Sequence, residues 1–159
     1  METSINFLAV LVAGIAGTAI GALWYSPMLF GKMWMSLSKV SQAQIEAAKK
    51  KGMAKQYILS FVGSLITAFV IALIAMQWDM PFFNTVKYAL PPGGMGMEPE
   101  PSSLVMAFSV AFWLWLGFIV PTLLSSVLWE KKPVTLYMVN IGHHLVSFFV
   151  MAAIVVFWN

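Results

Sequence analysis

The chain has 159 residues, of which 60% are hydrophobic and only 9% are charged. Soluble domains carry about a quarter charged residues, so this composition predicts a protein that faces lipid. The chain contains no cysteine, which excludes disulfides, thiolate metal sites and cysteine nucleophiles. All nine basic residues are lysines, which excludes guanidinium clamps, and the net charge of +3 does not indicate nucleic-acid binding.

Residues 5–25 form the first uncharged apolar run. As a helix this run is roughly 30 Å long, which matches the hydrocarbon thickness of a membrane. A signal peptide is the competing interpretation, but it needs a basic leader and a shorter apolar core, and here the leader holds only Glu2. Within the run, Ala13, Gly17 and Gly21 form a small-residue stripe that either makes a dimer or packs inside the chain, and we favour internal packing.

Residues 26–56 are expected to form two shorter helices. Ser26 and Pro27 suit the start of a helix whose apolar side lies in the membrane interface. A capping box at Ser41 then predicts a polar helix that ends at Gly52. The lysine cluster at 49–51 binds anionic lipid or simply sets the topology, and we favour the second interpretation.

Residues 57–77 form the second apolar span, with Thr67 near its centre and a small stripe that includes Ser60 and Ser64. Residues 78–103 differ in kind, because they hold five of the eight prolines and are expected to form an irregular loop. Such a loop is either a lid or partner site, or a tolerated surface insertion, and we favour the insertion.

Residues 104–128 and 134–158 form the third and fourth spans, joined by a short turn at 129–133. Pro121 lies inside the third span. Because proline has no N–H, it removes the helical bond to the Gly117 carbonyl and should bend the axis.

Aromatic residues near the ends of the spans predict anchors at the membrane interface. The predicted anchors are Trp24, Tyr25, Trp34, Trp78 and Trp129. Residues 26–56 and 129–133 together hold eight lysines, and the opposite side holds only Lys87. By the positive-inside rule, we expect a multi-pass protein of the inner cell membrane with both termini outside the cytoplasm.

The fourth span is interrupted by the polar residues Asn140, His143, His144 and Ser147. Their spacing of i, i+3, i+4 and i+7 places them along one side of a helix. Thr67 and the Gly117 carbonyl lie at a similar depth, about 15 Å from the lysine-rich ends of their helices. The predicted ligand site therefore comprises Asn140, His143, His144, Ser147, Thr67 and Gly117. This site either handles a proton or a small-molecule ligand, or only fastens helices through hydrogen bonds.

Cofactors are not expected. Adjacent histidines on one helix point about 100° apart, so His143 and His144 cannot clasp one haem iron, and haem could bind only through one histidine or across a dimer. A zinc site lacks carboxylates at the same depth, because Glu130 lies at one interface and Asp79 at the other. The sequence shows no nucleophile and base pair, so we expect no enzyme activity.

Several motifs resemble the domain of unknown function 1761 family, small four-helix membrane proteins mostly from bacteria. The motifs are Trp24-Tyr25-Ser26-Pro27, Phe30-Gly31, Trp34-Met35, Trp115-Leu116-Gly117-Phe118, Glu130 with Pro133, and Asn140, His144 and Trp158. The resemblance covers nearly the whole chain. It implies a fold and a membrane location but supplies no catalytic residues.

The sequence thus predicts an all-α membrane protein with four transmembrane helices in one bundle and a cytoplasmic helical segment between the first two. The bilayer is its expected partner, with no nucleic acid. A bundle of this size encloses little volume. Its small-residue stripes favour assembly into a homo-oligomer, and Pro121 is predicted to be a further packing residue.

Overall fold

The computed structural model describes residues 5–77 and 103–158. The predicted loop at 78–102 and the anchor Trp78 lie outside the described residues. All described elements are helices, in the order α1 (Phe7–Trp24), α2 (Gly31–Leu37), α3 (Gln42–Lys51), α4 (Ala54–Gln77), α6 (Ser103–Leu114), the π-helical turn η1 (Trp115–Ile119), α7 (Val120–Leu128) and α8 (Val134–Phe157).

Within the described residues, four helical stretches are long and apolar enough to cross a membrane, namely Phe7–Trp24, Ala54–Met76, Leu104–Leu128 and Val134–Trp158. The predicted fold class is therefore confirmed. In the 18-residue apolar stretch that defines each span, between 17% and 28% of the residues are buried inside the chain. The remaining surface is dominated by large apolar side chains, which need a lipid environment.

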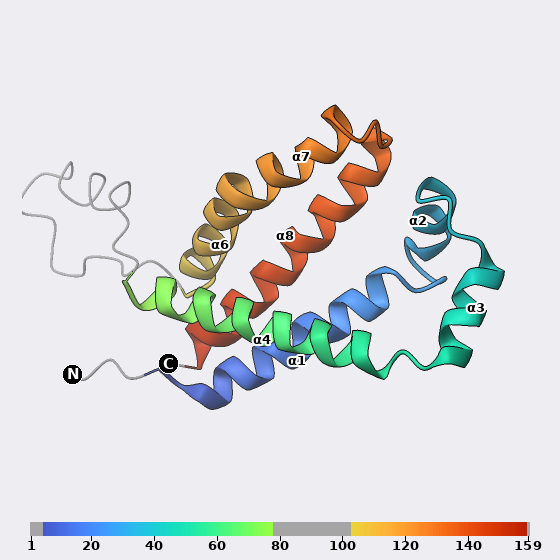
Figure 1. Ribbon diagram of the computed structural model, residues 1–159. Helices are drawn as coiled ribbons and strands as arrows, with labels where there is room; N and C mark the ends of the chain where they lie inside the picture. The colour runs from blue at the N-terminus through green and yellow to red at the C-terminus, as the bar shows by residue number, and fades with distance from the viewer. Residues whose placement is uncertain (1–4, 78–102, 159) are drawn as a thin grey trace, which may run out of the picture.

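The core lies where the four long helices meet near the two ends of the chain. Figure 1 shows the start of α1, the end of α4, the start of α6 and the end of α8 gathered near the two termini. The core is rich in alanine, which lets the backbones approach closely. Its buried members are Val10, Ala13, Ala68, Ile71, Ala72, Ala75, Ala107, Val110, Ala111, Met151, Ala152 and Val155.

Asn6 holds the two ends of the chain together. Its side-chain oxygen caps α1 by accepting from the N–H groups of Leu8 and Ala9. Its amide nitrogen donates to the carbonyl of Trp158 at 3.2 Å. One side chain therefore satisfies both the first turn of α1 and the last residues of the chain.

The predicted polar helix is confirmed as α3. Ser41 and Gln44 form a capping box, with the Gln44 N–H donating to the Ser41 hydroxyl and the Ser41 N–H donating to the Gln44 side chain. Gly52 ends the helix with a φ of 87°, a left-handed conformation that glycine adopts without strain.

The small-residue stripe of α1 packs inside the chain. Ala13 is fully buried. A Cβ atom added at Gly17 would collide with the Met151 side chain, and one at Gly21 would lie 3.4 Å from Nε2 of His143. These two glycines therefore set the distance between α1 and α8. On α4, by contrast, Ser60 is exposed and Ser64 is half-buried.

Pro121 follows a π-helical turn. The N–H of Val120 donates to the carbonyl of Trp115, five residues earlier, which widens the helix just before the proline. Such a turn accommodates a proline, which has no N–H to donate to the preceding turn of the helix. Two bonds join this region to α8: Trp115 Nε1 donates to the Ile141 carbonyl at 2.7 Å, and the Tyr137 hydroxyl donates to the Val120 carbonyl at 3.1 Å.

Candidate ligand site around His143

A tight turn after α1 shapes the candidate site. The Phe30 N–H donates to the Trp24 carbonyl at 3.0 Å, and the Gly31 N–H donates to the Ser26 carbonyl at 2.9 Å. The rings of Trp24 and Phe30 pack with their centroids 4.6 Å apart. A Cβ atom at Gly31 would collide with the backbone of Tyr25 and Ser26, so only glycine fits there. The turn directs Trp24 and Tyr25 toward α8.

Both aromatic residues form hydrogen bonds with α8. Trp24 Nε1 donates to the Val139 carbonyl at 3.1 Å, and the Tyr25 hydroxyl donates to Oδ1 of Asn140 at 3.0 Å. The Trp24 ring also lies over Gly142, where an added Cβ would come within 3.3 Å of the ring. The end of α1 and the polar side of α8 therefore form one packed unit.

Tyr25 acts as a donor in this unit. It follows the last residue of α1, and burial raises the pKa of its phenol. The hydroxyl therefore keeps its proton at neutral pH and can donate it to the amide oxygen of Asn140.

His143 lies at the centre of the unit. Its ring centroid is 6.1 Å from that of Trp24, 5.1 Å from that of Tyr25 and 5.0 Å from that of His144. Nε2 lies 3.3 Å from the hydroxyl of Ser147, which is buried. Nδ1 is buried and has no hydrogen-bond partner among the described residues.

The unpaired Nδ1 of His143 determines what the site can bind. A neutral imidazole has one donor and one acceptor nitrogen, and which is which depends on the tautomer. If Nε2 accepts from Ser147, Nδ1 is a buried donor; if Nε2 donates, Nδ1 is a buried acceptor. In either tautomer one hydrogen-bonding group remains for a further partner, and leaving it unsatisfied costs about 1–3 kcal/mol.

The structure brings together three of the six residues of the predicted ligand site, namely Asn140, His143 and Ser147. His144 lies beside them, with ring contacts to His143 and to Phe148 of its own helix. Thr67 and Gly117 are not part of this group. The Thr67 hydroxyl donates to the Gly63 carbonyl of its own helix at 2.9 Å. Gly117 is exposed, and a Cβ there would meet nothing within 4 Å.

Trp24 and Tyr25 were predicted as membrane anchors but line the site. Trp34 was also predicted as an anchor and also lines the site, because its ring centroid lies 5.8 Å from that of Tyr25. Trp129, by contrast, is 83% exposed. Two glycines, Gly31 and Gly142, could have indicated the inward aromatic rings in the sequence, since each is small where a ring or a turn approaches it closely.

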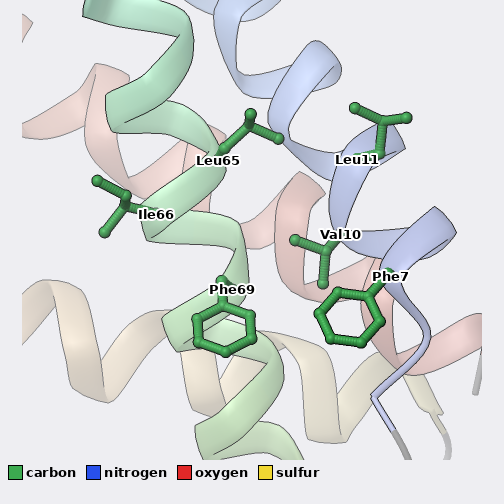
Figure 2. Close-up of a pocket in the computed structure, with 6 residues that line it drawn as sticks. All are labelled: Phe7, Val10, Leu11, Leu65, Ile66 and Phe69. Carbon is green, nitrogen blue, oxygen red and sulfur yellow. The ribbon is translucent and has the colours of Figure 1, made fainter.

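Two other features of the described residues add no chemistry to the His143 site. They contain no group of three metal-binding side chains. A groove of about 390 Å³ between α1 and α4 is lined only by apolar residues. Figure 2 shows Phe7 and Phe69 on its two sides, with their ring centroids 6.4 Å apart.

Comparisons with known proteins give one result. No curated protein and no solved structure matches the chain significantly. The profile of one family, described as "Protein of unknown function (DUF1761)", matches residues 8–156. This range includes the turn after α1, the π-helical turn and the His143 site. The four membrane-spanning helices and this match together show that the chain is a membrane protein of the DUF1761 family.

Proposed function

We propose that this protein binds a small polar ligand, or passes a proton, at His143. The observation that carries the proposal is the buried Nδ1 of His143, which has no hydrogen-bond partner among the described residues. Buried polar atoms are paired in the great majority of cases, and the exceptions are often functional. Ionisable residues inside membrane spans commonly mark ligand or proton pathways.

The surroundings of His143 suit a small ligand. Trp24 and Tyr25 supply ring surfaces, and Asn140 and Ser147 supply polar groups at either end. An apolar enclosure with a few placed polar groups is the usual composition of a small-molecule site. The proposal includes no covalent step, no cofactor and no enzyme activity.

A second candidate function is purely structural. Four side chains make hydrogen bonds between α8 and the rest of the chain: Trp24, Tyr25, Trp115 and Tyr137. All four bonds involve α8 within residues 137–141. If fastening helices is their only role, the protein is an accessory component of the membrane, and His143 fills space between two rings.

Replacement of His143 by leucine separates the two functions. If the site handles a ligand or proton, the change should remove a retained small molecule in native mass spectrometry, or lower proton flux into vesicles on the order of a hundredfold. Thermal stability in detergent should stay close to wild type, because leucine removes the unpaired nitrogen. The matched control is His144→Leu, which changes the neighbouring imidazole and should leave the signal intact.

The structural function predicts the opposite pattern. His143→Leu would then lower the melting temperature, and wild-type protein would show neither a retained molecule nor proton flux. Equal losses in both histidine variants would also contradict a specific site at His143.

We also propose an orientation and an assembly. The protein lies in the inner cell membrane. The segment that holds α2 and the lysine-rich helix α3 faces the cytoplasm, as does the turn before α8, and both termini face away from it. The small residues Ser60 and Ser64 on α4, which are exposed and half-buried respectively, let a second copy approach closely and support a homo-oligomer. The same mass spectra report the number of subunits.

A further inference from the structure

A charged cleft lies between α2 and the start of α8, beside the His143 site, with which it shares Trp34 and Asn140. It has a volume of about 460 Å³. Trp34 and Lys39 line it on the α2 side, residues 130–133 line it from the turn, and Asn140 lines it from α8. Figure 1 shows α2 beside the N-terminal half of α8 at the end of the bundle away from the chain termini. The cleft therefore opens at the lysine-rich end.

The cleft is positively charged. It is lined by three lysines, Lys39, Lys131 and Lys132, and by one carboxylate, Glu130. Lys132 forms an ion pair with Glu130 at 2.7 Å, in which both side chains are about half exposed. This pair leaves the ammonium groups of Lys39 and Lys131 for an outside anion.

Two further groups favour an anion in the cleft. Oδ1 of Asn140 accepts from Tyr25, so the amide nitrogen of Asn140 remains as a donor. Helix α8 begins at the cleft with Pro133 as its N-cap, and no side chain caps its first turn. The positive end of its dipole therefore adds to the charge of the lysines.

The apolar part of the lining indicates the source of the anion. Trp34, Leu37 and Leu136 lie beside the charged groups, and α2 adjoins the end of a membrane span. A volume of this size falls within the usual range for small-ligand pockets, about 300–1,000 Å³. A free anion gains little from the apolar wall, whereas the glycerol and first acyl carbons of a lipid can pack on it.

We propose that this cleft binds the phosphate group of an anionic lipid, with Lys39 and Lys131 as its main cationic partners. Basic pockets at the cytoplasmic ends of spans bind anionic headgroups in this way. The proposal does not depend on the ligand at His143, although Asn140 borders both sites.

The test uses the full chain in neutral detergent and measures the melting temperature against added phosphatidylglycerol, phosphatidylcholine or inorganic phosphate. Lys39→Asn with Lys131→Asn is the test variant, because both lysines have a positive φ, 56° and 54°, that asparagine tolerates. Lys49→Asn with Lys50→Asn is the control, since it removes the same charge from the exposed helix α3.

Phosphatidylglycerol should stabilise the wild type and the control equally. At roughly a fivefold change per lysine, the test variant should need about thirty times more lipid for the same shift. Glu130→Gln should act in the opposite direction, because it removes the repelling carboxylate and frees Lys132. This variant keeps the test decisive if the double lysine variant folds poorly.

Other outcomes also decide the proposal. If inorganic phosphate stabilises the protein with the same dependence on Lys39 and Lys131, the phosphate site is supported and its source is soluble. Equal stabilisation by phosphatidylcholine, equal loss in both lysine pairs, or no stabilisation by either phosphate source would overturn it.

Discussion

Replacing Gly31 by alanine is expected to destabilise the protein by about 3 kcal/mol, at the upper end of the range for overpacking. The added Cβ would collide with the Tyr25 carbonyl and would lie 2.6 Å from the Ser26 carbonyl oxygen. Both are backbone atoms, which cannot rotate away as a side chain can. The turn would have to open, and Trp24 and Tyr25 would lose their positions against α8. Unfolding in detergent, followed by circular dichroism, measures the loss.

Gly63→Ala and Gly117→Ala are the matched controls. An added Cβ meets nothing within 4 Å at either position, and both residues lie in helical segments. Alanine is a better helix former than glycine by up to about 1 kcal/mol, so these variants should be neutral or slightly more stable. Equal destabilisation at all three glycines would contradict the close turn described around Gly31.

Replacing Trp24 by alanine is expected to cost about 3–5 kcal/mol, as for other large aromatic residues removed from packed sites. The change removes the hydrogen bond to the Val139 carbonyl and the ring contacts with Phe30 and His143. It also leaves a void over Gly142. Trp24→Phe keeps most of the ring volume and should cost about 1 kcal/mol, the usual value of one hydrogen bond.

Trp113→Ala is the control for this series. Trp113 is 55% exposed, and its described ring contact is with Phe112, the residue before it. Its removal should change the free energy of unfolding by about 0.5 kcal/mol or less. If Trp24→Ala were as mild as Trp113→Ala, Trp24 would be a membrane anchor, as its sequence position suggested, and not part of the site.

The sequence was sufficient for the fold because long apolar runs leave few alternatives. A stretch of about twenty uncharged residues must be helical in a membrane, since no water is present to satisfy its backbone groups. Local signals were also reliable: the Ser41 capping box begins α3 through side-chain hydrogen bonds, and the left-handed Gly52 ends it.

The candidate site was predicted only in part, because sequence spacing gives the depth of a residue but not the neighbour it faces. Thr67 and Gly117 lie at a depth similar to that of the histidines, yet Thr67 bonds its own helix and Gly117 is exposed. A π-helical turn contains an extra residue, so it also rotates the residues around Gly117 relative to an ordinary helix.

Tyr25 is a residue of the site that the sequence predicted only as a membrane anchor. An aromatic residue at the end of an apolar span suits the membrane interface, and hydropathy cannot distinguish that position from one against a neighbouring helix. The turn from Ser26 to Gly31 makes the distinction, because it folds α2 back toward α8 and covers Tyr25 with Trp34.

The central claim is that the end of α1 and the polar side of α8 form one site around His143. A double-mutant cycle with Tyr25→Phe and Asn140→Leu tests it most directly, because these two side chains share the 3.0 Å hydrogen bond between the two segments. The account predicts a coupling free energy of about 1 kcal/mol in detergent unfolding. Single changes that add to within about 0.3 kcal/mol would show that the two residues are independent and would contradict the site.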